Sequence, residues 1–571
     1  MKHIWQKIII GLLFFFLVIG GIAYHERHNI RRFFLVNQVH RSAHILTTAQ
    51  IKLNLKPALS TKNTTTTNQL SATYRRKLAN LSVGITHAKV IVNPYKTSPL
   101  TGLILVKTSQ ATQVTMRVLG DSPQTTITKK IPGYTKQHQV GILGLYANRT
   151  NHVQLTFTTK SGTKITKTYF LRTGKASARI GTNTVKTSHP TQMALGTGNT
   201  KLTFAVSSQG ITYGLDAQGK VRWYSTNYIS HVFKQLANGH LLILTKINPN
   251  DHHYNALQET DYYGRVYRQY NFNGLFPSKT NHKKLVTNTV IHHDAIELPD
   301  HNLLLTVSDG GADYVEDTMI ELDRQTGKIK KVIDLKRILP KSAYTKYHGT
   351  TRSDGKLDWF HQNSMYYDKR TGTLIVSGRN QDMIFAINCK TTKLKWILAA
   401  NQKLPTRYQK YLLKPTTKHY KFNAGQHAVM LLQPDKAKKN QLQLQYYDNN
   451  VVVTRGNQSV SKKYSAGTIV SINQLKKTVT KTWSYGKSRG TYDFTNIVGS
   501  SYAVGKGNTL INFGYADSGK RSEFVEVNRK TKYVVFDVNR TNFPSWDWTY
   551  RAQRMSLFPK HTHFSLKNIN Q

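Results

Sequence analysis

One short pattern recurs six times in this chain and constrains its fold more than any other feature. Each copy is an aspartate or asparagine that opens a tight turn, followed by a basic strand of alternating polarity. The copies begin at Asp216, Asp261, Asp323, Asn388, Asn473 and Asn528. Such turns join neighbouring antiparallel strands. Six copies, 45 to 85 residues apart, fit four-stranded units with loops of variable length and predict a six-bladed β-propeller.

A histidine recurs at one point in the strands between these turns. His231, His293, His361 and His427 each open such a strand, and an Asn or Asp follows seven or eight positions later. We expect these strands to be the innermost of their blades, where they run along the central channel. Equivalent points of successive blades face the same axis, so imidazoles at this register are expected to converge.

The first part of the chain predicts export. Residues 1–24 contain the apolar run Ile8–Ala23, preceded by two lysines, which indicates a membrane anchor or a cleaved signal. We favour an anchor that holds the protein on the extracellular face of the cell membrane, whereas cleavage would secrete it. The polar, basic residues 25–77 are expected to form a stalk with one short helix near Asn37–Leu53.

Two folded parts are expected after the stalk. Short alternating segments over residues 78–173 predict a small β-sandwich. Residues 174–195 lack periodicity and are expected to link it to the propeller, residues 196–571. The predicted fold class is therefore all-β: a six-bladed β-propeller preceded by a small N-terminal β-sandwich and a membrane anchor.

The charge of the chain is extreme. Lys and Arg number 81 and Asp and Glu 28, for a net charge of +53. Such a charge favours polyanions or anionic surfaces as partners. The basic residues are scattered through turns and polar faces, without an arginine-rich arm or a nucleic-acid-binding signature, so nucleic acid is not expected. An anionic cell-wall polymer fits this distribution better.

The segment around His361 combines several hydrogen-bond donors. Residues two apart in a strand share a face, so His361 and Asn363 are expected to point the same way. Arg379, on the adjoining strand, would join them, and His293 and His427 would approach from neighbouring blades. Imidazole, carboxamide and guanidinium groups together suit a tetrahedral oxyanion. These five residues are the predicted anion site.

The same region argues against other chemistries. No group of carboxylates accompanies the histidines, since only Asp294 and Asp358 lie near them in sequence. Glycoside hydrolysis, which needs two facing carboxylates, is therefore not expected, and neither is a catalytic metal. No phosphate loop is present, and we expect no cofactor. Five other histidines of this region are interpreted as packing, turn or loop residues or as the opposite face of a strand: His231, His240, His252, His253 and His292.

Several motifs resemble the bacterial arylsulfate sulfotransferases, which do not use phosphoadenosine phosphosulfate. In the predicted sandwich they are Asn93–Leu100 and Ile142–Phe157. In the predicted propeller they are HHDAIELPDHNLLL, DWFHQNSMYYDKRTGTLIVSGRNQD and GQHAVMLL, followed by Tyr550–Phe558 near the end. Each motif is a moderate signal, and their common order along the chain makes the resemblance specific.

The resemblance implies a ping-pong transfer. His427, in the GQH motif, would attack the sulfur of an aryl sulfate ester and hold the sulfuryl group as sulfohistidine until a phenol takes it. His361, Asn363 and Arg379 would stabilise the charge on the sulfuryl oxygens. His293, alone or together with His361, would act as general acid and base.

The implied partners are a phenolic sulfate donor and a phenol acceptor. Ser500 or Ser501, in the expected inner strand of the sixth blade, would add a hydroxyl group to the substrate-binding site. Some relatives carry a disulfide, which this chain cannot form within itself because Cys389 is its single cysteine.

Two other functions stay open at this point. A propeller without catalytic activity could bind anionic envelope polymers or sulfated glycans, with an affinity that salt weakens and that does not need His427. Hydrolysis of sulfate esters would use the same residues with water as the acceptor.

Overall fold

The fold is that of a computed structural model. It describes residues 45–569 except 273, 278–284, 288, 312, 350, 353, 401–403, 433–437, 455–461 and 560–561. The expected anchor, residues 1–24, and the first part of the expected stalk lie outside the described residues. Among the residues that are described, no helix combines the length and the apolar character needed to cross a membrane.

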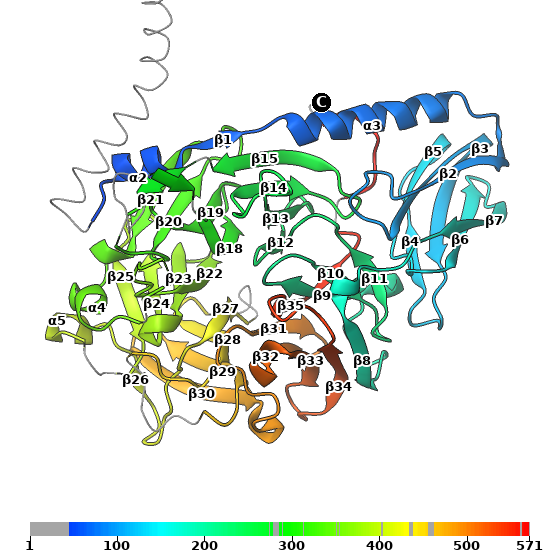
Figure 1. The fold of residues 1–571 in the computed structure, drawn as a ribbon. Helices are drawn as coiled ribbons and strands as arrows, with labels where there is room; N and C mark the ends of the chain where they lie inside the picture. The colour runs from blue at the N-terminus through cyan, green and yellow to red at the C-terminus, as the bar shows by residue number, and fades with distance from the viewer. Residues whose placement is uncertain are drawn as a thin grey trace, which may run out of the picture.

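Six antiparallel sheets follow one another around a central axis and form the predicted propeller (Figure 1). From inner to outer edge, blade 1 consists of β35 (Thr549–Ser556), β9 (Lys201–Ser207), β10 (Tyr213–Leu215) and β11 (Val221–Tyr224). Blade 2 consists of β12 (Phe233–Gln235), β13 (Leu241–Thr245), β14 (Ala256–Thr260) and β15 (Val266–Phe272). Blade 3 consists of β18 (Ile291–Glu297), β19 (Leu303–Val307), β20 (Thr318–Leu322) and β21 (Ile329–Asp334).

Blades 4, 5 and 6 follow in the same order. Blade 4 consists of β22 (Gln362–Asp368), β23 (Thr373–Gly378), β24 (Met383–Asn388) and β25 (Leu394–Leu398). Blade 5 consists of β27 (His427–Leu431), β28 (Gln441–Asp448), β29 (Ala466–Asn473) and β30 (Thr478–Tyr485). Blade 6 consists of β31 (Ser500–Gly505), β32 (Asn508–Ala516), β33 (Arg521–Asn528) and β34 (Val534–Thr541). Short elements in the connections are β16 (Leu275–Pro277), β17 (Leu285–Thr287), β26 (Lys414–Pro415), α4 (Ser342–Thr345) and α5 (Thr406–Gln409).

The six predicted turns join the two outer strands of the six blades, as expected. In each turn the side-chain Oδ1 of the leading Asp or Asn accepts hydrogen bonds from two backbone N–H groups within the next four residues. For Asp216 the donors are the backbone N–H groups of Gln218 and Lys220, at 2.9 and 3.0 Å. This local bonding explains why short polar side chains mark every copy of the repeat.

Both ends of the propeller sequence help to close the ring. The C-terminal strand β35 pairs with β9 and so becomes the inner strand of blade 1. Strand β8 (Thr182–Ser188) pairs with β34 at the outer edge of blade 6. The expected linker, 174–195, is therefore not free chain, because its middle is a propeller strand. An outer edge strand buries little apolar surface, so its sequence gave no hydrophobic signal.

The predicted sandwich contains β2 (Gly84–Val92), β3 (Thr101–Val118), β4 (Ile127–Lys130), β5 (Thr135–Leu143), β6 (Thr150–Thr159) and β7 (Lys164–Arg172). The long strand β3 pairs with β2 and β5 through its first half and with β4 and β6 through its second half. Strand β3 therefore belongs to both layers of the sandwich. The sandwich packs on blade 1, where the buried Arg222 guanidinium donates to the carbonyl oxygens of Gly144 and Thr125, both at 2.7 Å.

The described part of the expected stalk is folded onto the propeller, which corrects that prediction. Helix α2 (Thr48–Leu55) buries Ile51 and Leu55 in the core that blades 2 and 3 share. Strand β1 (Pro57–Leu59) pairs with β15 as a fifth strand of blade 2. Only a few apolar side chains make these contacts, so the polar composition of the segment concealed them.

Helix α3 (Lys62–Ala79) connects the propeller to the sandwich and runs beside both (Figure 1). Thr67 Oγ1 accepts from the backbone N–H of Val266 in blade 2 at 3.1 Å. Further along the helix, the Tyr74 hydroxyl donates to the carbonyl oxygen of Pro94 in the sandwich at 2.5 Å. The threonine-rich stretch 64–67 is thus helical, and the helix to which it belongs contacts both folded parts.

Candidate active site

The recurrent histidines meet where the inner strands of blades 2 to 5 begin. Ring centroids lie 5.2 Å apart for His231 and His293, 4.4 Å for His293 and His361, and 6.3 Å for His361 and His427. The predicted convergence is confirmed. His231, which was interpreted as a packing residue, is the first member of this histidine arc.

The inner strands are irregular at the histidines. Register shifts separate Gln362 from Ser364 and His427 from Met430, and His361 and His231 have the left-handed φ values of 52° and 54°. A β-bulge re-aims the side chains around it, and a non-glycine residue with positive φ costs free energy that the surrounding structure must offset. The alternation rule therefore fails between His361 and Asn363.

Asn363 is correspondingly placed between blades 4 and 5. Its Nδ2 donates to the carbonyl oxygen of Gln426 at 2.7 Å, and its Oδ1 accepts from Ser364 Oγ at 3.0 Å. The side chain is fully buried. Because Gln426 precedes His427 directly, this amide fixes the strand that carries the histidine. The sequence predicted instead that Asn363 would share a face with His361 and donate to an anion.

The two serines are also bonded within the propeller. Ser500 Oγ accepts from the backbone N–H of Ala552 at 3.1 Å, between blades 6 and 1. Ser501 Oγ accepts from Gln445 Nε2 at 2.8 Å, between blades 5 and 6. Both side chains are fully buried, and these bonds give them a structural role rather than the predicted role in substrate binding.

His427 is held in one tautomer by Asn449, at the end of β28. Asn449 Nδ2 donates to the carbonyl oxygens of Thr495 and Val498, at 3.0 and 2.8 Å. Its Oδ1 must therefore be the acceptor that lies 2.7 Å from His427 Nδ1, which carries the hydrogen. Burial, followed by the charges of Arg379 and His361, lowers the pKa of His427 well below its usual value. The ring is neutral, with the lone pair on Nε2.

His361 has the opposite protonation state. Its Nδ1 lies 2.5 Å from Asp358 Oδ2 and 2.9 Å from Glu316 Oε2. Burial alone would lower its pKa, but the two carboxylates outweigh burial and raise the pKa of His361 to about 10. Because the carboxylates take up Nδ1, the Nε2–H of this charged imidazolium is the donor left for a substrate.

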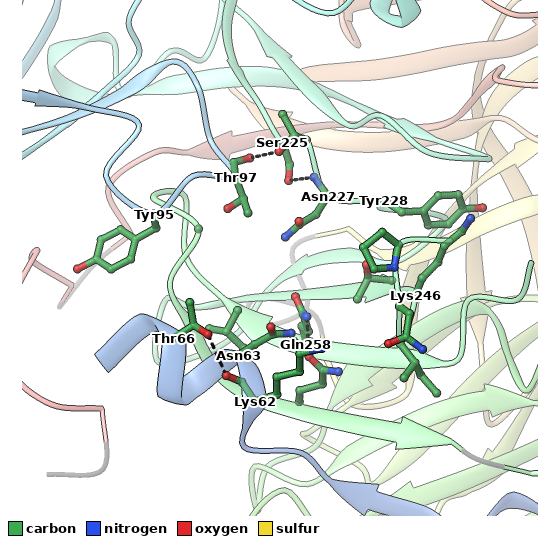
Figure 2. Close-up of a pocket in the computed structure, with 18 of the residues that line it drawn as sticks. Lys62, Asn63, Thr66, Tyr95, Thr97, Ser225, Asn227, Tyr228, Lys246 and Gln258 are labelled. Atoms are coloured by element: carbon green, nitrogen blue, oxygen red, sulfur yellow. Dashed lines mark hydrogen bonds between the residues drawn. The ribbon is translucent and has the colours of Figure 1, made fainter. Parts of the chain in front are cut away.

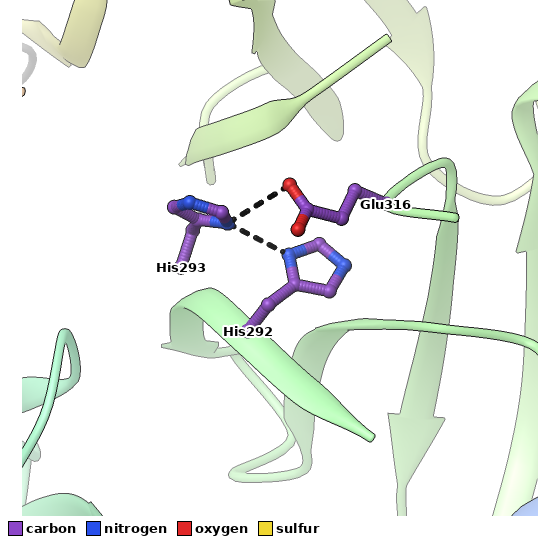
Figure 3. Close-up of side chains that lie close together, drawn as sticks. All are labelled: His292, His293 and Glu316. Carbon is purple, nitrogen blue, oxygen red and sulfur yellow. Dashed lines mark hydrogen bonds and ion pairs between the residues drawn. The ribbon is translucent and has the colours of Figure 1, made fainter. Parts of the chain in front are cut away.

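Glu316 joins His361 to a second pair of histidines. Its Oε2 lies 3.5 Å from His293 Nδ1, which is 3.0 Å from His292 Nδ1 (Figure 3). Burial lowers the pKa of His292 to about 4 and holds the pKa of His293 well below its usual value. The expectation that no carboxylate group accompanies the histidines is therefore wrong: Glu316 and Asp358 both do.

Asp294, one of the two carboxylates noted in the sequence, follows His293 in β18 and pairs with cations from blades 1 and 2. Its Oδ1 lies 3.0 Å from an Arg551 guanidinium nitrogen and 2.9 Å from Lys234 Nζ. Arg551 also donates to the carbonyl oxygen of Asn363 at 2.8 Å. The carboxylate thereby helps to tie blades 1 to 4 together beneath the histidine arc.

Arg379 lies next to His427, whose pKa it lowers. One guanidinium nitrogen donates to Asn380 Oδ1 at 2.8 Å and another to the carbonyl oxygen of Asn496 at 3.3 Å. Its Nε is buried and makes no hydrogen bond among the described residues. The guanidinium thus brings a positive charge with one unused donor close to His427.

Aromatic rings border the arc on the side of His231. The ring centroid of Tyr550 lies 4.4 Å from that of His231 and 5.8 Å from that of His293. On the other side, His231 contacts Tyr254, which stacks on Tyr228 with centroids 5.7 Å apart.

Tyr228 also lines a polar cavity of about 680 Å³ between α3, the sandwich and blades 1 and 2. Figure 2 shows Lys62 and Asn63 of α3 on one side of it, with Tyr228 and Lys246 on another. Two stacked tyrosines therefore separate this cavity from the histidine arc.

Three residues of the site escaped the sequence argument. Glu316 lies in an aperiodic connection before β20, Asn449 follows a strand where an Asn pair indicates only a turn, and Tyr550 is one of 31 tyrosines. None of them belongs to a repeated pattern. The available signals were the place of Tyr550 at the start of the motif Tyr550–Phe558 and the Asn pair that marks a turn after β28.

Two family models match the chain. The Arylsulfotransferase (ASST) model matches residues 187–551, and the Arylsulfotransferase Ig-like domain matches residues 89–174. Two curated relatives carry the name arylsulfate sulfotransferase AssT. The protein from Escherichia coli O6:H1 is 25% identical over 324 residues, 46% of this chain and 52% of the relative. The protein from Lelliottia amnigena is 23% identical over 417 residues, 62% of this chain and 64% of the relative.

The alignments thus span about half to just under two thirds of these relatives. Among solved structures, a putative 6-phosphogluconolactonase from Bacteroides fragilis is 10% identical and covers 78% of this chain and 98% of its own, with a TM-score of 0.32. That score is too low to carry an argument. The first model, in contrast, spans more than half of the chain and coincides with the propeller that carries the histidine arc, so this protein belongs to the arylsulfotransferase family.

Proposed function

We propose that this protein transfers the sulfuryl group of a phenolic sulfate ester to a phenol by a ping-pong mechanism through sulfohistidine at His427. One observation carries the proposal. A neutral imidazole, with Nδ1–H held by Asn449, lies beside the charged groups of His361 and Arg379. A neutral ring supplies the nucleophile, and the two cations complement a sulfuryl group that stays anionic throughout the reaction.

In the first half-reaction, the Nε2 lone pair of His427 forms the N–S bond. The ester S–O bond breaks, its electron pair stays on the phenolate oxygen, and His361 Nε2–H protonates that oxygen. The His427 ring becomes cationic as the N–S bond forms, and the Asn449 Oδ1 acceptor stabilises it through the shorter, charge-assisted hydrogen bond. Asn363 acts by positioning, since it holds the backbone next to His427.

In the second half-reaction, the acceptor phenol loses its proton to His361 Nε2, now neutral, and its oxygen forms a new S–O bond. The N–S bond breaks and its electron pair returns to His427 Nε2. His361 thus gives and regains one proton. This cycle supports His361, rather than His293, as the general acid and base, because His293 has its pKa lowered well below neutrality.

Planar substrates suit the aromatic side of the site. Tyr550 and Tyr254 lie next to His231 at one end of the arc, and their rings can stack on the aryl groups of the donor and the acceptor. We also propose export, attachment to the outer face of the membrane through residues 1–24, and contact with anionic wall polymers. The net charge of +53 supports that contact.

The test uses the full chain, because α2, β1 and α3 are part of the folded body. It is mixed with p-nitrophenyl sulfate, first without acceptor and then with phenol. We expect one equivalent of nitrophenol in a burst, an added SO₃ group on the peptide containing His427, and steady turnover only with phenol. His427→Ala should lose all three, while the matched variant of an exposed histidine, His87→Ala, should lose none.

Other outcomes separate the remaining functions. Steady release of nitrophenol that is indifferent to phenol would indicate sulfate-ester hydrolysis. No burst from folded protein, together with salt-sensitive binding to a sulfated polymer that His427→Ala retains, would indicate a binding propeller.

A further inference from the structure

Three potential ligand atoms converge at one side of the histidine arc. His292 Nδ1 and His293 Nδ1 lie 3.0 Å apart, and Glu316 Oε2 lies 3.5 Å from His293 Nδ1 (Figure 3). All three atoms lie within 4.8 Å of one another. In a tetrahedral zinc site, ligand distances of about 2.0–2.1 Å place neighbouring ligand atoms about 3.3–3.4 Å apart. The two measured separations bracket this value, so the atoms already have the spacing of a coordination sphere.

One of these three atoms, Glu316 Oε2, accepts no hydrogen bond among the described residues. His361 Nδ1 has one hydrogen, and Asp358 Oδ2 receives it at 2.5 Å. Glu316 Oε2 lies near the same nitrogen, is buried, and accepts no hydrogen bond among the described residues. A buried carboxylate oxygen without a donor is costly unless a cation compensates it. Two cations lie beside the carboxylate, with His361 Nδ1 at 2.9 Å from Oε2 and an Arg352 guanidinium nitrogen at 3.1 Å from Oε1, so what Oε2 has is an unfilled acceptor position rather than an uncompensated charge.

Two overlapping sets of potential ligands share Glu316, and the hydrogen bond of His361 distinguishes between them. Glu316 also lies near Asp358 and His361, which form a second set of potential ligands. The hydrogen on His361 Nδ1 occupies the lone pair that a metal would need there, whereas His292 and His293 can each present Nδ1 when the hydrogen is on Nε2. The pair of adjacent histidines is thus the better set.

We propose that His292, His293 and Glu316 bind one divalent transition-metal ion of the Zn²⁺ class. Two imidazole nitrogens and one carboxylate are the donors of open zinc sites, whereas Ca²⁺ and Mg²⁺ prefer oxygen ligands. A fourth position stays open for water or a substrate oxygen. The site gives His293 a role other than acid–base catalysis, and binding of the ion does not depend on sulfuryl transfer.

The test measures metal binding by the full chain rather than activity. The protein is freed of metal with a chelator, titrated with Co²⁺ as a spectroscopic probe, and separately loaded with Zn²⁺ and analysed for bound metal after gel filtration. We expect one equivalent of tightly bound ion, visible d–d absorption of a four- or five-coordinate Co²⁺ site, and a rise in the unfolding temperature with Zn²⁺. His292→Gln and Glu316→Gln should each lose the equivalent, the absorption and the rise.

A matched variant accounts for the many histidines of this chain. His252→Gln removes an exposed histidine from a nearby loop and should bind as much metal as the native protein. Equal binding by the native protein and both ligand variants would overturn the proposal. If neither ligand variant folds, the Co²⁺ titration of the native protein still tests the proposal. Co²⁺ that shows only the weak absorption of a hexaaqua ion would overturn the proposed site.

Discussion

Asn449→Asp tests the neutral state of His427 on which the proposed transfer depends. Asn449 Oδ1 accepts the Nδ1–H of His427 at 2.7 Å, and aspartate keeps an oxygen at that place but adds a negative charge. A carboxylate at this range raises the pKa of an imidazole by about 1–3 units, equivalent to about 1.4–4 kcal/mol. In the native protein the pKa of His427 lies well below 6.5, so the ring is neutral across the physiological range.

The expected result is a new pH dependence. Sulfuryl transfer to the native enzyme should not change between about pH 6 and 9, whereas in the variant the rate should fall about tenfold per pH unit below the raised pKa, because a protonated ring cannot attack. The variant also loses two donors to the carbonyl oxygens of Thr495 and Val498, at about 0.5–1.5 kcal/mol each. Its free energy of unfolding should decrease by about 1–3 kcal/mol.

The assay is the single-turnover burst of nitrophenol, followed by rapid mixing at each pH without acceptor. Asn512→Asp is the matched control: Asn512 is also fully buried and donates to a backbone carbonyl, that of Thr549, but lies in blade 6 away from His427. Its burst should keep the native pH profile. If the folded Asn449→Asp protein also keeps that profile, Asn449 does not hold Nδ1–H and the tautomer assigned to His427 is wrong.

Two further predictions concern the acid and the N-terminal segment. Asp358 and Glu316 raise the pKa of His361 to about 10, so the native burst rate should fall as pH rises through that value; His361→Gln should remove this alkaline limb and slow the burst by about 10²–10⁴-fold. An unchanged limb in the variant would assign it to another group. Leu55→Ala removes a fully buried side chain from α2 and should lower the free energy of unfolding by about 2–5 kcal/mol, measured by urea titration of tryptophan fluorescence. A loss below about 0.5 kcal/mol would mean that α2 is not part of the folded body.

The repeated elements of this fold were predictable because their causes are local. An Asp or Asn side chain bonds to the backbone of its own turn, so Asp216 and its five equivalents marked the outer hairpins of all six blades. The strands between those turns are short and apolar, and their histidines recur at one register. Convergence of His293, His361 and His427 then followed from the rotational arrangement of the blades, without any knowledge of their contacts.

The contacts of the N-terminal segment could not be predicted in this way. Residues 48–59 mix apolar and polar side chains, and their attachment depends on a few side chains such as Leu55 and on the pairing of β1 with β15. Backbone pairing at a sheet edge needs no particular side chains, so no sequence pattern announces it. The same holds for β8, which was expected to be linker.

The sequence by itself determined the number of blades, the strands that line the channel, and the histidines that open them. The tertiary structure decided what those histidines are chemically. The pKa of an imidazole depends on burial and on charges within a few ångströms. Glu316, which with Asp358 raises the pKa of His361, and Asn449, which fixes the tautomer of His427, both come from connections without periodicity. The bulge before Ser364 likewise directs the Asn363 side chain toward blade 5, where it forms a hydrogen bond between the two blades. Proximity between segments distant in sequence is a property of the folded chain, and here it makes His427 neutral and His361 charged.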